Sequence, residues 1–186
     1  MLCFQASKDA LFAPVVNRLL QLGISANLVS ILSGLVAALS LFFALKFNTP
    51  LIFIVGICFH LLLDGLDGII ARFKSRKSSK IGLAMDLIFD SVGIVTIGLY
   101  ILYFKYVGAT AALLFIIEYL ILNATSYIFA ITNKEYAFVI RPRIFILAAI
   151  LFDYIFLYSI TPFFIIVSNI TLTFFILIGI VKLFKP

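Results

Sequence analysis

The chain has 186 residues, of which 65% are hydrophobic and only 12% are Asp, Glu, Lys or Arg. A soluble domain of this length has too little interior to hide so much apolar surface, so a soluble globular protein is excluded. The net charge of +6 does not indicate nucleic-acid binding, because the basic residues lie in short gaps between long apolar segments. The composition predicts a single all-α integral membrane domain over residues 1–186.

The first predicted element is an amphipathic helix over 8–22, which we expect to lie in the membrane interface. Apolar side chains recur there at three- and four-residue spacing from Leu11 to Leu22, and the polar side chains lie off that stripe. Proline is tolerated better in the first turn of a helix than in its interior. The regular part of this helix is therefore expected to begin near Pro14.

Six apolar segments follow, each close to the roughly 20 residues that cross a bilayer as a helix. They are predicted at 27–46, 51–72, 82–104, 108–131, 142–160 and 162–182, so the six-span bundle covers 27–182. Lys46 and Lys105 are the only two of the 14 Lys and Arg residues on one side, and the other twelve lie opposite. Because basic residues are retained in the cytoplasm, both termini are expected there, with the protein in the cell membrane.

Four carboxylates interrupt the second and third spans. Asp64 and Asp67 are three residues apart, and Asp86 and Asp90 are four apart, so each pair shares one helix face. Asp at mid-span costs roughly 2.5–3.5 kcal/mol on insertion scales, and four together repel one another unless positive charge lies among them. Oxygen ligands without His or Cys favour Mg²⁺ or Mn²⁺, and two such ions suit an in-line phosphoryl displacement.

Small and basic residues accompany the acids. Gly68, Ala71 and Gly82 would leave room for a ligand, although small residues also let membrane helices pack closely. Arg72 lies on the cytoplasmic side of the acids, where it is placed to pair with a phosphate or diphosphate. The loop that follows is basic. Its positive charge either attracts anions to the site and the membrane surface, or only fixes the orientation of the chain in the membrane. The site is expected to face the cytoplasm.

Eight residues across these two spans stand at defined spacing. They fill the pattern D-x2-D-G-x2-A-R-x9-G-x3-D-x3-D, at Asp64, Asp67, Gly68, Ala71, Arg72, Gly82, Asp86 and Asp90. The pattern resembles the signature of the CDP-alcohol phosphatidyltransferases, membrane enzymes of phospholipid synthesis with six spans. The resemblance implies that a CDP-linked lipid, either CDP-diacylglycerol or an ether counterpart, places its diphosphate on the metal. A hydroxyl group of a small polar alcohol then attacks the lipid-proximal phosphorus, and CMP leaves.

The resemblance also implies a role for each residue of the pattern. Two ions, Mg²⁺ or Mn²⁺, would be held by Asp64, Asp67, Asp86 and Asp90. Asp90 would in addition be the catalytic base that takes the proton from the attacking hydroxyl, next to a cation that lowers the pKa of that hydroxyl. The nucleotide and its phosphates would lie against Asn27, Gly68, Ala71, Arg72 and Gly82. The protein would work among membrane lipids, and we expect a homodimer.

Two segments outside the pattern match the family less well. The triplet S-A-N over 25–27 stands where members often have T-P-N, which keeps Asn27 but loses a rigid turn. Arg141 and Arg143 flank a proline, as in the branch that transfers inositol phosphate, but the acids of that branch are missing. The two arginines would bind a phosphorylated acceptor or only anchor the helix. Glycerol phosphate, an inositol phosphate and serine all stay open as acceptors.

Three isolated ionisable residues lie within the spans. His60 precedes Asp64 by one turn, and we expect it to be packed rather than to act as an outer partner of the site. Glu118 and Asp153 lie nearer the outer half, away from the four acids. For both, we expect hydrogen-bonded packing or a dimer contact in preference to catalysis.

Other functions explain less of the sequence. A divalent-cation transporter or channel would account for the four carboxylates but not for Gly68, Ala71 and Arg72 at fixed offsets from them. An enzyme that joins a soluble CDP-alcohol to diacylglycerol is disfavoured, because that branch usually has more spans. A structural membrane subunit accounts for none of these residues.

Overall fold

The structure is a computed structural model, and it describes residues 2–73, 80–132, 142–157 and 159–184. These residues form seven helices and no strand, so the predicted all-α class is confirmed. The helices are α1 (Leu2–Gln21), α2 (Ala26–Phe47), α3 (Pro50–Phe73), α4 (Lys80–Tyr103), α5 (Ala109–Ile131), α6 (Pro142–Phe156) and α7 (Thr161–Phe184).

Five of these helices, α2, α3, α4, α5 and α7, are long and apolar enough to cross a membrane. The chain is therefore a multi-pass membrane protein.

Turn residues explain where the spans end. Ser25 caps α2 by accepting a hydrogen bond from the N–H of Leu28, and Asn48 closes the helix in the left-handed conformation. Pro50 then opens α3, where the missing N–H is harmless.

The predicted fifth span over 142–160 is too long. α6 has 15 residues and ends at Phe156, which gives a length of about 22 Å against the roughly 30 Å of a hydrocarbon core. Leu157 breaks the helix with a left-handed backbone, at φ 55°. The carboxylate of Asp153 then accepts hydrogen bonds from the N–H groups of Ile160 and Thr161, at 2.8 and 3.0 Å, and so starts α7.

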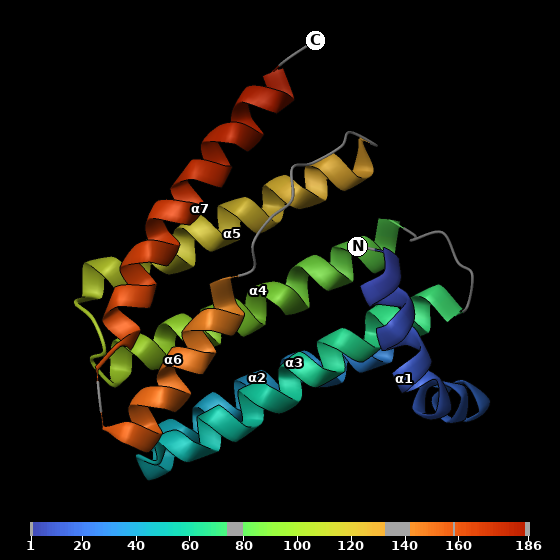
Figure 1. The fold of residues 1–186 in the computed structure, drawn as a ribbon, viewed down its shortest axis with the longest axis horizontal. Helices are drawn as coiled ribbons and strands as arrows, with labels where there is room; N and C mark the ends of the chain where they lie inside the picture. The colour runs from blue at the N-terminus through green and yellow to red at the C-terminus, as the bar shows by residue number, and fades with distance from the viewer. Residues whose placement is uncertain (1, 74–79, 133–141, 158, 185–186) are drawn as a thin grey trace.

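The long helices pack in a connected bundle in which α2 lies along α3, α4 contacts α2 and α5, and α7 covers α5 (Figure 1). Small residues allow the closest approaches, because a Cβ atom at Gly56 would overlap Ser40 and one at Gly98 would overlap Ile116. A stacked pair of rings, Phe53 and Tyr100, fills the core with centroids 4.1 Å apart.

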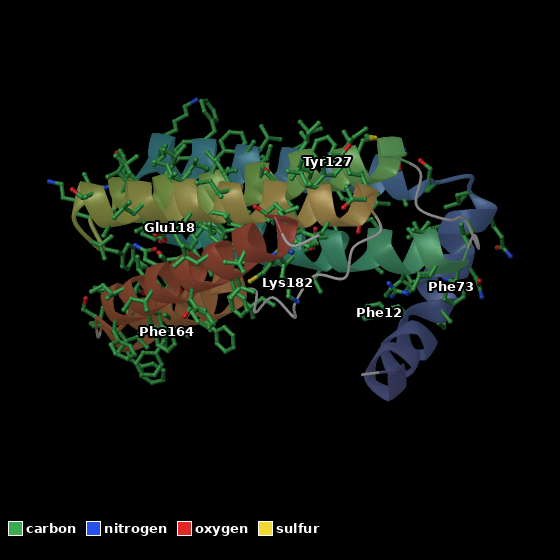
Figure 2. The ribbon with its side chains drawn as sticks, turned by 90° about the horizontal axis from the view of Figure 1, so that it is seen from above. Phe12, Phe73, Glu118, Tyr127, Phe164 and Lys182 are labelled. Carbon is green, nitrogen blue, oxygen red and sulfur yellow. The ribbon has the colours of Figure 1, made fainter. Side chains whose placement is uncertain are left out.

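α1 lies at the end of the bundle where α3 ends and α4 begins, and it projects to one side (Figures 1 and 2). Val16 is fully buried there in a small cluster with Val29 of α2 and Ile69 and Ile70 of α3. The predicted apolar stripe does not pack against the bundle along its whole length, because Val16 is buried whereas Leu22 is 75% exposed.

The expected start of the helix near Pro14 is wrong, because α1 begins at Leu2 and continues through the proline. A proline inside a helix removes one backbone hydrogen bond and the ring presses on the preceding turn. The apolar side chains after Pro14 are held against the bundle by packing, which local propensity does not take into account.

Candidate active site

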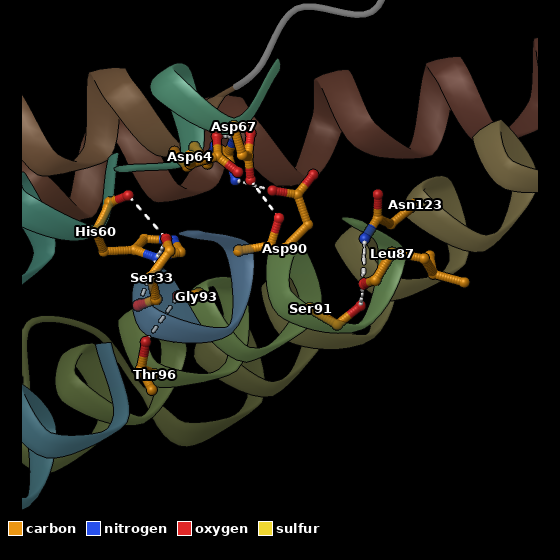
Figure 3. A network of polar contacts seen from close by, with 12 residues as sticks. Ser33, His60, Asp64, Asp67, Leu87, Asp90, Ser91, Gly93, Thr96 and Asn123 are labelled. Carbon is orange, nitrogen blue, oxygen red and sulfur yellow. Dashed lines mark hydrogen bonds and ion pairs between the residues drawn. The ribbon is translucent and has the colours of Figure 1, made fainter. Parts of the chain in front are cut away.

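The four predicted carboxylates lie close together on adjoining turns of α3 and α4, where Asp86 and Asp90 both act electrostatically on Asp67. Asp64 and Asp67 occupy successive turns of α3 and face Asp90 of α4 (Figure 3). The side chains of Asp64 and Asp90 are only 21% and 20% exposed. Asp86 lies one turn earlier on α4 and is exposed. The helical spacing of the acids thus produces the shared faces that the sequence predicts.

Asp67 is held by a serine from α2. The hydroxyl of Ser30 donates a hydrogen bond to Asp67 Oδ2 at 2.6 Å, and Ser30 itself is 2% exposed. This hydrogen bond fixes the orientation of the carboxylate. Sequence reasoning does not connect Ser30 with Asp67, because the two residues are 37 positions apart.

Arg143 of α6 supplies positive charge between the other two acids. Its Nη2 atom lies 2.7 Å from Asp64 Oδ2, and its Nη1 atom lies 2.6 Å from Asp90 Oδ1. Arg143 is 2% exposed, although it stands in the first turn of its helix. The two carboxylates therefore converge on one cationic group, and α6 is tied to both α3 and α4 at this point.

A family model described as CDP-alcohol phosphatidyltransferase matches residues 23–181 of the chain. The chain belongs to this family. The match extends from just before α2 into the last turn of α7, and all of α1 lies outside it. The family predicted from the eight-residue pattern is thereby confirmed. No curated protein matches the sequence with significance.

The remaining residues of the pattern lie at the same end of the bundle. Ala71 and Arg72 are exposed in the last turn of α3, and Gly82 is half-buried in the first turn of α4. A Cβ atom at Gly68 would lie 3.5 Å from Arg72 Nη1, so the arginine side chain passes close to this glycine. Asn27 is exposed in the first turn of α2. Arg141 lies outside the described residues.

His60 is packed beneath the acids, as expected. It is 1% exposed, its Nδ1 atom lies 2.7 Å from Ser33 Oγ, and its backbone carbonyl accepts a hydrogen bond from the same hydroxyl at 2.9 Å (Figure 3). The Nε2 atom faces Gly93 of α4, and a Cβ atom at position 93 would overlap it. His60 therefore fixes how closely α3 and α4 approach one turn away from Asp64.

Asn123 of α5 supports α4 from the other side. Its side-chain amide donates to the Leu87 carbonyl at 3.3 Å and to Ser91 Oγ at 3.2 Å (Figure 3). Both acceptors belong to the turn of α4 that carries Asp90. Sequence reasoning does not find this role, because no local pattern connects Asn123 with Ser91, which is 32 positions away.

Glu118 and Asp153 make the hydrogen-bonded packing that the sequence predicts. Glu118 Oε1 accepts a hydrogen bond of 2.7 Å from Thr173 of α7. Asp153 is 8% exposed and caps the start of α7, as described above. Neither residue belongs to the acid cluster between α3 and α4.

The donor set suits a hard divalent ion, on which enzymes of this family generally depend. The cluster offers carboxylate oxygens, and two of them already converge on a single cation, Arg143. No set of three or more His, Cys, Asp or Glu within the described ranges has the geometry of a metal site. The chemistry of the residues fits Mg²⁺ or Mn²⁺, whereas their arrangement around Arg143 is that of ion pairs.

Proposed function

We propose that the protein transfers a phosphatidyl group from a CDP-linked lipid to the hydroxyl group of a small polar alcohol and releases CMP. CDP-diacylglycerol or an ether counterpart would be the donor. Membership of the CDP-alcohol phosphatidyltransferase family supports this reaction class over cation transport. The observation on which the proposal depends is that Asp64 and Asp90, from different helices, converge on one cation at a half-buried site.

The roles of the acids follow the chemistry of the transfer. Asp64, Asp67, Asp86 and Asp90 would hold one or two Mg²⁺ or Mn²⁺ ions. When bound, the ions would neutralise the diphosphate and polarise the phosphorus that is attacked. Asp90 would accept the proton of the acceptor hydroxyl as its oxygen bonds to the lipid-proximal phosphorus. The bond from that phosphorus to the bridging oxygen breaks, and the oxygen leaves with CMP.

The nucleotide would lie at the end of the bundle where α2 and α4 begin and α3 ends. Asn27, Gly68, Ala71 and Gly82 would form its surroundings there, because each is small or exposed. Arg72 would pair with a phosphate oxygen through its planar guanidinium group. Arg143, with Arg141, would favour an anionic acceptor such as glycerol phosphate or inositol phosphate, because Arg143 reaches the proposed base.

The membrane topology is also a proposal. We place both termini and the site in the cytoplasm of a six-span protein, with α6 as the fifth span. Five crossings would put Lys182 and Lys185 outside, against the retention of basic residues in the cytoplasm. α6 is short because its first turn already lies at the depth of the acids, where Arg143 meets Asp64. A homodimer in the cell membrane belongs to the same proposal.

The proposal is tested by CMP release from purified protein. With Mg²⁺ or Mn²⁺ and CDP-diacylglycerol, CMP should appear when the right alcohol is added from a panel of acceptors. Asp90→Asn should reduce this rate about 10²–10⁴-fold, as for the loss of a general base, while CDP-lipid binding remains. Glu118→Gln is the matched control, since it changes a membrane carboxyl group away from the acids. Folded protein that released no CMP with any acceptor would contradict the proposed reaction.

A further inference from the structure

Arg143 makes contacts that a divalent ion at this site would also need. Both terminal nitrogens of its guanidinium group are engaged, one with Asp64 Oδ2 at 2.7 Å and the other with Asp90 Oδ1 at 2.6 Å. The arginine is 2% exposed, so these ion pairs are screened little by solvent. A carboxylate oxygen that faces a guanidinium group cannot bind a divalent ion in the same direction without bringing two positive charges together.

We infer that Arg143 and the divalent metal compete for Asp64 and Asp90, so that metal binding releases the guanidinium group from the acids. The inference rests on the proposed function, in which these two residues are metal ligands. Arg143 is then a positioning residue, because its ion pairs hold the two half-buried carboxylates together until the metal replaces it.

The surroundings of Arg143 allow the exchange. The arginine is tied to the acids only through its terminal nitrogens, because Nε has no hydrogen-bond partner among the described residues. The rest of α6 is anchored separately, since Ile146 is fully buried and Asp153 fixes the far end of the helix. α6 is therefore held in place by contacts other than those of the guanidinium group.

The exchange would impose an order on the reaction. While Arg143 is paired with both acids, two of its five N–H groups are occupied and the carboxylates balance its charge, so its attraction for an anionic acceptor is weak. After the metal has taken Asp64 and Asp90, the guanidinium group is available beside the proposed base. Metal binding is therefore expected to come before binding of a phosphorylated acceptor.

The test is a Mn²⁺ titration of the full-length protein in detergent, followed by the electron paramagnetic resonance of free Mn²⁺. Arg143→Met removes the competing charge and keeps the side-chain volume. If the guanidinium group occupies the acids nine-tenths of the time, this variant should bind Mn²⁺ about tenfold more tightly. Arg18→Met is the matched control, because Arg18 is exposed on α1 and its loss changes the net charge equally.

The outcomes separate competition from other roles. Tighter binding in Arg143→Met, with no change in Arg18→Met, supports the competition. An affinity of Arg143→Met equal to that of the wild type, or weaker, overturns it, because the arginine would then lie beside the ion or support its site. Should Arg143→Met not fold, Arg143→Lys replaces it, since one ammonium group cannot pair equally with both acids. Arg143→Lys should also bind Mn²⁺ more tightly than the wild type does. Mn²⁺ binding by Arg143→Lys that is equal to that of the wild type, or weaker, overturns the inference.

CMP release by the wild type, measured on the same preparation, keeps the two proposals distinct. Activity with unchanged Mn²⁺ affinity in Arg143→Met leaves the proposed function standing and removes the competition. Tighter Mn²⁺ binding in Arg143→Met, with no CMP release by the wild type with any acceptor, supports the competition and contradicts the proposed function.

Discussion

Replacement of Gly93 by alanine tests the packing beneath the acids. A Cβ atom at position 93 would overlap Nε2 of His60 and lie 2.8 and 3.1 Å from two ring carbons. The ring is 1% exposed and is held by Ser33 at 2.7 Å, so it cannot turn away without losing that contact. Gly93→Ala must therefore either push α3 and α4 apart or displace His60.

The expected loss of stability can be worked from these contacts. Overpacking a filled site costs about 1–3 kcal/mol, and losing the contact with Ser33 would add about 0.5–1.5 kcal/mol. The higher helix propensity of alanine returns up to about 1 kcal/mol. We therefore expect Gly93→Ala to lower the free energy of unfolding by roughly 1–3 kcal/mol. Gly65→Ala is the matched control on α3, because nothing lies within 4 Å of its added Cβ atom.

The assay is unfolding in mixed micelles with increasing sodium dodecyl sulfate, followed by far-ultraviolet circular dichroism. Gly65→Ala should be as stable as the wild type or slightly more stable. Adding His60→Ala to Gly93→Ala should recover part of the loss, because the obstacle is then gone; neighbouring residues typically couple by about 0.5–3 kcal/mol. Equal unfolding curves for Gly93→Ala and Gly65→Ala would refute the idea that His60 limits the approach of α4.

Two further predictions concern Ser30 and Asp153, which support the site and the fold through hydrogen bonds. Ser30→Ala should weaken Mn²⁺ binding about 10–100-fold, because Ser30 orients Asp67, one of the proposed metal ligands. Ser40→Ala is the control and should leave the affinity unchanged, because the Ser40 hydroxyl donates to a carbonyl within α2. Mn²⁺ titration measures the affinity of both variants, and equal affinities would show that Ser30 does not orient Asp67 for metal binding. Asp153→Ala should lower stability by about 1–3 kcal/mol for each of the two N–H groups left without an acceptor, and Asp153→Asn should lose less. Thermal unfolding decides this, and an unchanged midpoint for Asp153→Ala would contradict it.

The long helices could be predicted because their signals are local. Apolar runs bounded by turn residues predict a span at 27–46, and α2 covers Ala26–Phe47. The helical spacing of Asp64 and Asp67 likewise places both acids on one face, whatever the rest of the chain does. The family followed from eight residues within 27 positions of one another.

The features that sequence reasoning missed depend on distant parts of the chain. Arg143 meets acids that are 53 and 79 positions away, and no local pattern couples them. The early end of α6 depends on Asp153 reaching forward to the backbone of Thr161, a contact that hydropathy cannot register. α1 continues past Pro14 because the bundle offers a surface for Val16.

α6 has polar side chains engaged at both of its ends. Arg143 is fixed by the acids at one end, and Asp153, ten residues later, is fixed by the backbone that starts α7. These ten residues set a distance of about 15 Å along the helix between the turn before α7 and the acid cluster. One residue more or less in that stretch would rotate the guanidinium group by about 100° around the helix axis. The interval between Arg143 and Asp153 is thus as strict a requirement of the fold as the intervals within the acidic pattern itself.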